Sequence, residues 1–127
     1  MFYVVESDKS FHEATIDLEA VVQRLGFVIL GSHDLGALLR GKEIDVDEEC
    51  KVFAVANYRQ IEKLLAADTR LGLALPWHLS VFTENGATKI GVLRPEAMLA
   101  MLSAGDEVSR LARDLEEKVI QMVGETR

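Results

Sequence analysis

Residues 71–93 read LGLALPWHLSVFTENGATKIGVL, and this stretch decides the fold. Asn85-Gly86 lies between two apolar runs, which is the strongest short-range signal for a β-hairpin. A two-residue type I′ turn requires positive φ at both central residues, and Asn and Gly tolerate it. We therefore predict a loop that leads through Pro76 into a hairpin whose turn is Asn85-Gly86.

The turn also fixes which residues of the hairpin face one another. It sets Val81 opposite Ile90 and Leu79 opposite Val92. Because side chains alternate along a strand, one face is wholly apolar and the other is mixed. The apolar face consists of Trp77, Leu79, Val81, Ile90 and Val92, and the mixed face consists of His78, Ser80, Phe82, Lys89, Gly91 and Leu93. We predict that the apolar face packs into the core. The mixed face is left as solvent-exposed surface, partner surface or the lip of a pocket.

Capping residues mark the predicted helices. Ser10 with Glu13 three positions later is a capping box, and apolar residues then recur at helical spacing up to Gly26, which predicts a helix over residues 10–25. Asp34 and Asn57 are N-cap residues for two further helices, and proline at position 95 suits the first turn of another. We also predict strands over residues 2–5, 27–30 (extending toward 33) and 52–56, helices over 35–40 and 106–123, and an acidic loop over 42–49.

This succession of elements predicts one α+β domain over residues 1–127. The long elements follow the order β-α-β-β-α-β-β-α, with a short helix after the second strand and another before the last helix. Consecutive strands with interspersed helices are typical of a mostly antiparallel sheet, which we expect in a two-layer fold with helices packed on one face. A chain of 127 residues is long enough for one real core.

Composition narrows the classes of function. Hydrophobic residues make up 49% and charged residues 28%, which is ordinary for a globular protein. The net charge of −7 and the dispersed Lys and Arg residues disfavour nucleic-acid binding. No apolar run approaches the ~18 residues of a transmembrane helix, and the N-terminus lacks the pattern of a signal peptide. Cys50 is the single cysteine, which excludes an intrachain disulfide. We expect a cytoplasmic protein with no nucleic-acid partner and no membrane association.

Four short motifs resemble, in their order and spacing, the family called domain of unknown function 302. They are Gly26-Phe27, residues 52–57, residues 71–77 and Arg94-Pro95. The resemblance spans roughly residues 11–101. It implies a small two-layer α/β fold related to the TATA-binding-protein repeat and, because members are often dimers, a homodimer. It implies the fold more securely than any function.

The chain departs from the family pattern at two places. The family commonly has Cys after Leu-Pro, where this chain has Trp77, and it commonly has Asn-Pro, where this chain has Asn57-Tyr58. If the family's activity uses that thiol, this chain lacks it.

Trp77 and His78 are the first candidate ligand-binding residues. Trp77 is either a large core residue or the wall of an apolar ligand pocket. A further hypothesis is that the indole fills a cavity that relatives with the smaller Cys leave open. His78 points to the mixed face of the hairpin. It is therefore either a solvent-exposed or capping residue, or a side chain that contacts a ligand or a metal.

His33, Asn57 and Tyr58 complete the candidate set. His33 lies at a strand end, where a pairing with His78 across the sheet is conceivable. Asn57-Tyr58 marks a strand-to-helix junction, which is either a simple cap or an anion site formed by backbone amides. No histidines have the spacing of a metal site, and no phosphate loop or nucleophile motif is present. We therefore expect no metal, no cofactor and no catalytic residue, and we interpret Cys50 as structural.

The sequence thus favours a noncatalytic cytoplasmic domain that dimerises and binds a small ligand. One alternative is a structural or protein-interaction module without a ligand. Another is an enzyme or a redox or metal-binding protein, as relatives with the Leu-Pro-Cys thiol could be. Trp77 in place of that cysteine weakens this last alternative.

Overall fold

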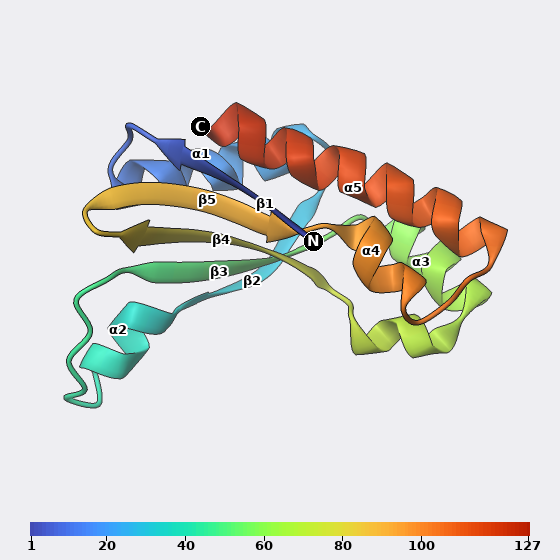
Figure 1. Ribbon diagram of the computed structural model, residues 1–127, viewed down its shortest axis with the longest axis horizontal. Coiled ribbons are helices and arrows are strands. Elements are labelled where there is room, and N and C mark those ends of the chain that lie inside the picture. Colours follow the sequence, from blue (N-terminus) through green and yellow to red (C-terminus); the bar gives the residue numbers. More distant parts are fainter.

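The structure is a computed structural model that describes all residues 1–127 (Figure 1). Its strands are β1 (Phe2–Ser7), β2 (Val28–Asp34), β3 (Cys50–Ala56), β4 (Trp77–Glu84) and β5 (Ala87–Leu93). Its helices are α1 (Phe11–Arg24), α2 (Leu35–Arg40), α3 (Tyr58–Ala67), the 3₁₀-helix η1 (Thr69–Leu73), α4 (Pro95–Ala100) and α5 (Asp106–Thr126). The predicted order of elements and the α+β class are confirmed.

The five strands form one sheet in the order β1-β5-β4-β3-β2, and every neighbouring pair is antiparallel. The predicted hairpin register is confirmed, with Val81 opposite Ile90 and Leu79 opposite Val92. Asn85 and Gly86 both have positive φ, as the predicted turn requires. The helices α1 and α5 cover one face of this sheet, and the other face is left open (Figure 1).

The hydrophobic core lies between the sheet and the layer formed by α1 and α5. It is one cluster of 22 buried residues, and all five residues of the hairpin's apolar face belong to it. Trp77 and Val92 are each 5% exposed, and the other three are fully buried. The prediction that this face turns inward is confirmed.

Caps set the helix boundaries. Ser10 and Glu13 form the predicted capping box of α1, whose C-terminus is followed by Gly26 at positive φ. The side chain of Asp34 accepts a hydrogen bond from the amide of Ala37, and Asn57 caps α3 in the same way. Several bounds differ from the prediction, since β1 continues to Ser7 and β2 runs from Val28 to Asp34. Residues 69–73 form η1 inside the predicted loop, β3 begins two residues earlier at Cys50, and α5 continues to Thr126.

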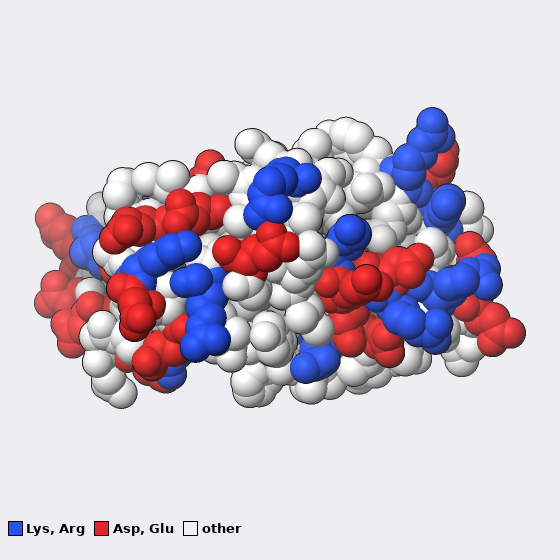
Figure 2. All heavy atoms as spheres, turned by 90° about the horizontal axis from the view of Figure 1, so that it is seen from above, with Lys and Arg blue, Asp and Glu red and all other residues white.

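The helical side of the molecule carries interspersed charges of both signs (Figure 2). Arg24 of α1 contacts Glu125 of α5 at 2.5 Å, and Lys9 contacts Asp17 at 2.8 Å. Exposed pairs of this kind contribute at most about 1 kcal/mol each. None of the helices combines the length and the hydropathy that crossing a bilayer requires.

Candidate functional site

The open face of the sheet carries the hairpin's mixed residues and their neighbours on the other strands. His78 lies level with Ala54 of β3 and Gly31 of β2, while Ser80 lies level with Val52. On the other side, Gly91 of β5 pairs with Val4 of β1. Because α1 and α5 lie on the other side of the sheet, the side chains in the middle of this face are available to a ligand or a partner (Figure 1).

One end of the open face is hollowed into a groove of about 530 Å³. Strands β1, β4 and β5 form its floor, and η1 and α4 with the residues that follow α4 form its wall. Eleven of its 14 lining residues are hydrophobic, and none is Asp, Glu, Lys or Arg. This volume and this lining are typical of small-molecule sites, which span about 300–1,000 Å³ and are mostly apolar.

Trp77 lies at the junction of the core and the groove. Its indole is 5% exposed, and the side chain contributes both to the hydrophobic core and to the lining of the groove. The indole Nε1–H donates a hydrogen bond of 2.9 Å to the carbonyl oxygen of Leu93. This bond fixes the ring against the end of the opposite strand. Trp77 is therefore a rigid part of the groove.

Two polar side chains lie in this otherwise apolar site. His78 is exposed and Ser80 is half-buried, and both belong to the groove lining. An imidazole and a hydroxyl each donate and accept hydrogen bonds, so they suit a ligand with one polar group on an apolar body.

Gly91 keeps the floor of the groove low. A Cβ atom at this position would lie 2.6 Å from Cγ2 of Val4 and 3.3 Å from the carbonyl oxygen of Tyr3. Any larger residue would therefore push the neighbouring strand or project into the groove. The glycine leaves room in the centre of the floor.

The rim of the groove exposes large apolar side chains. Leu73 is 81% exposed, Met101 75%, Phe2 66% and Leu93 47%. Sequence reasoning included Leu93 in the mixed face but missed the other three. No local pattern could have found them, because the rim unites the first strand, η1 and the residue after α4.

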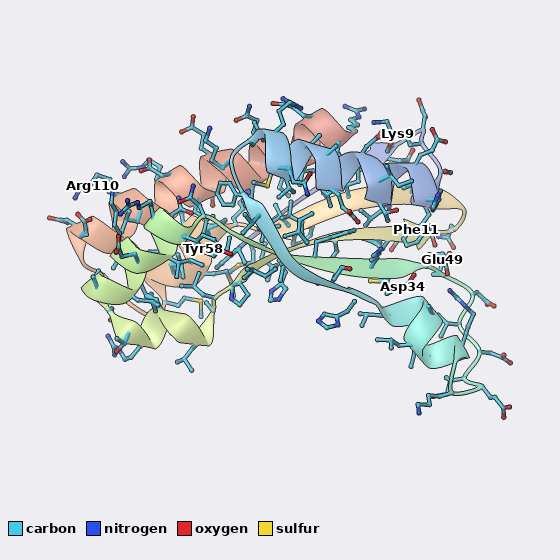
Figure 3. The ribbon with its side chains drawn as sticks, turned by 180° about the vertical axis from the view of Figure 1, so that it is seen from behind. Lys9, Phe11, Asp34, Glu49, Tyr58 and Arg110 are labelled. Carbon is cyan, nitrogen blue, oxygen red and sulfur yellow. The ribbon has the colours of Figure 1, made fainter.

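The remaining candidate residues lie outside the groove. His33 is on the open face, but it lies level with Val52 while His78 lies level with Ala54, so one strand and two residues of register separate the two rings. Asn57 caps α3, and Tyr58 is exposed at the end of the molecule opposite Asp34 and Glu49 (Figure 3). The structure thus brings Trp77 and His78 together in the groove, while Asn57 meets Trp77 only at a small cavity on the core side of the sheet. No three or more His, Cys, Asp or Glu side chains gather in a metal-binding cluster.

Cys50 also faces the open side of the sheet, beyond the groove, where it pairs with Phe82. Partial burial and then the negative charge of Asp34 raise the pKa of its thiol above the ordinary value. A raised pKa reduces the thiolate fraction, which makes this cysteine a poor nucleophile at neutral pH.

The acidic loop that precedes β3 is anchored at its C-terminal end. One carboxylate oxygen of Glu48 accepts a hydrogen bond from the hydroxyl of Thr83, and the other accepts one from the amide of Asn85. Glu49 forms an ion pair with Arg40 of α2 at 2.5 Å. These contacts tie the loop and α2 to the hairpin turn.

Comparison with known proteins assigns the chain to a family. The family described as "Domain of unknown function DUF302" matches residues 3–126. This chain belongs to the DUF302 family. A crystal structure described as an uncharacterized conserved protein DUF302 from Bacillus stearothermophilus is similar over 99% of this chain and 98% of that chain, with a TM-score of 0.91 and 26% identity. No curated protein matches the chain.

Membership confirms the resemblance that the four motifs predicted, and the match extends on both sides of residues 11–101. The family and the similar structure supply the fold and no function. For this DUF302 chain, function must therefore be argued from the groove itself.

Proposed function

We propose that this DUF302 protein is a noncatalytic, cytoplasmic binding protein that holds a small, mostly apolar molecule in the groove and works as a homodimer. The observation that carries the proposal is an open groove of about 530 Å³ with no charged residue in its lining. Leaving so much apolar surface exposed is unfavourable for a monomer and is typical of binding sites.

The groove also supports a chemical class of ligand. Its apolar floor and rim favour a flat ring system or a short branched chain, while His78 and Ser80 offer hydrogen bonds at one position. A strongly anionic or cationic molecule would lose its hydration without gaining an ion pair there. We therefore propose an uncharged ligand, or one whose charged end stays in water.

Nile red, an uncharged apolar dye whose emission rises in apolar sites, provides the test. We expect the native protein to bind it. Leu73→Glu should weaken binding by about tenfold or more, because it removes an apolar contact and the dye would displace water from the new carboxylate. Ile16→Glu is the matched control, since Ile16 is 54% exposed on α1 and lies outside the groove. No dye binding by the native protein, or equal loss in both variants, would refute the proposal.

A protein-interaction module without a ligand remains the second candidate. It is favoured by a specific observation, the exposed leucines of α2, which lie outside the groove. In that case the open face would bind protein, and Nile red would show no affinity that depends on Leu73.

A further inference from the structure

A second apolar feature lies at the far end of the open face. In α2, Leu35, Leu38 and Leu39 are 40%, 58% and 39% exposed, and Ile44 in the following loop is 51% exposed. The helix packs against the ends of β2 and β3. It projects below the sheet, on the side away from α1 and α5 (Figures 1 and 3). Exposed apolar side chains gathered in this way are typical of interaction sites.

The groove and α2 cannot meet within one chain. Both η1, which forms part of the groove wall, and α2 lie below the sheet, at opposite ends of the molecule (Figure 1). One face therefore carries an apolar projection and an apolar hollow. Consider a twofold axis that is parallel to this face, perpendicular to the line joining the two features and halfway between them. It would place each feature on the other feature of a second copy. This is the arrangement of an isologous dimer.

We propose that a second copy of this chain closes the groove, with α2 of each protomer packed across the rim of its partner's groove. The ligand of the proposed function would then lie on the floor at Trp77, His78 and Gly91, beneath the leucines of the partner's α2. The site is open to solvent in one chain and becomes enclosed only in the pair. This inference rests on the proposed function for the ligand, whereas the arrangement of the two chains is independent of it.

Charge favours these two surfaces over the rest of the molecule. Each chain carries −7, so two copies repel one another at long range, and the repulsion adds least where the facing surfaces carry no charge. The groove lining has no charged residue, and the only charged residue of α2 is Arg40, which is already paired with Glu49. The helical side, in contrast, carries many charges of both signs (Figure 2). The contact between α2 and the groove would therefore bury no unpaired charge.

The sheet supplies part of the area that a stable dimer needs. Five strands about 4.8 Å apart and about 20 Å long present a projected area of roughly 500 Å², to which α2 at one end and η1 with α4 at the other end add. A stable interface buries about 800 Å² per partner. This is about a tenth of the chain's accessible surface of 7325 Å².

Disulfide trapping tests the arrangement. In a Cys50→Ser background, Leu38→Cys and Leu73→Cys are combined, and the protein is oxidised and run on a non-reducing gel. Both positions are exposed, at 58% and 81%, so the variant is expected to fold. We expect a covalent dimer from the double variant and a monomer from each single variant. The control pair Leu38→Cys with Ile16→Cys should remain monomeric, because Ile16 is on α1 on the opposite side of the sheet.

Two results would overturn the inference. The first is cross-linking of the double variant no faster than that of the control pair. The second is efficient cross-linking of Leu38→Cys alone, which would place α2 against α2. Light scattering adds an independent readout, with two chains expected for the native protein and one for Leu38→Glu. No ligand is used, so cross-linking without Nile red binding would refute only the ligand-binding part of the proposed function. Nile red binding without cross-linking would refute only this arrangement of the dimer.

Discussion

The substitution Trp77→Phe tests whether the indole joins the core to the groove. The change removes the Nε1–H group that donates to the carbonyl of Leu93, and it shrinks a side chain that is 5% exposed. A net hydrogen bond contributes about 1 kcal/mol, and leaving the carbonyl unpaired adds to this loss. The smaller ring also buries less apolar surface, which costs about 1 kcal/mol more. The free energy of unfolding should fall by about 2–3 kcal/mol.

Urea unfolding followed by far-ultraviolet circular dichroism measures this loss, because the only tryptophan is removed in the variant. With an m-value of about 1–3 kcal/mol per molar urea, the midpoint should fall by about 0.7–3 M. Tyr58→Phe is the control, because Tyr58 is 67% exposed, and it should change stability by less than about 0.5 kcal/mol. A Trp77→Phe protein within about 0.5 kcal/mol of the native protein would refute the structural role assigned to the indole.

Two further predictions concern single sites on the open face. Gly91→Ala should destabilise the protein by about 1–3 kcal/mol, because its Cβ would lie 2.6 Å from Val4. Gly124→Ala, with no atom near its Cβ, should stabilise α5 by up to about 1 kcal/mol. Thermal unfolding that shows the same sign for both variants would contradict the close approach at Gly91. Alkylation of Cys50 by iodoacetamide should have its midpoint above the ordinary thiol pKa of about 8.5, because burial and the charge of Asp34 raise the pKa, and Asp34→Asn should move the midpoint to lower pH while still capping α2. The raised pKa also means that the contribution of Cys50 to stability is present below the pKa of the unfolded thiol. It is lost as the pH rises through the pKa of the folded thiol. An alkylation profile unchanged in Asp34→Asn would show that the carboxylate has no influence on the thiol pKa.

Local signals in the sequence carried much of the fold. Asn85-Gly86 fixed the register of the hairpin, and the register fixed which face is buried. Ser10, Asp34 and Asn57 correctly predicted the starts of three helices. Each cap bonds an amide only three residues further along the chain, so a short stretch of sequence is enough to recognise it.

The features that remained unpredicted depend on contacts between distant segments. The pairing of β1 with β5, which adds Phe2 and Val4 to the groove, joins residues about ninety positions apart and leaves no trace in either strand alone. The helix η1 was missed because its five residues are too few to show an apolar stripe at helical spacing. The groove depends on both, so the sequence could suggest Trp77 and His78 as candidates but could not show that one cavity contains them.

The central claim is that the open face of the sheet is the binding face. Its most direct test is a two-dimensional amide NMR titration of the native protein with Nile red. We predict that the shifts concentrate on amides of β4, β5 and η1, with His78, Gly91 and Leu73 among them. Shifts confined to α1 and α5, or no specific shifts at all, would contradict the claim.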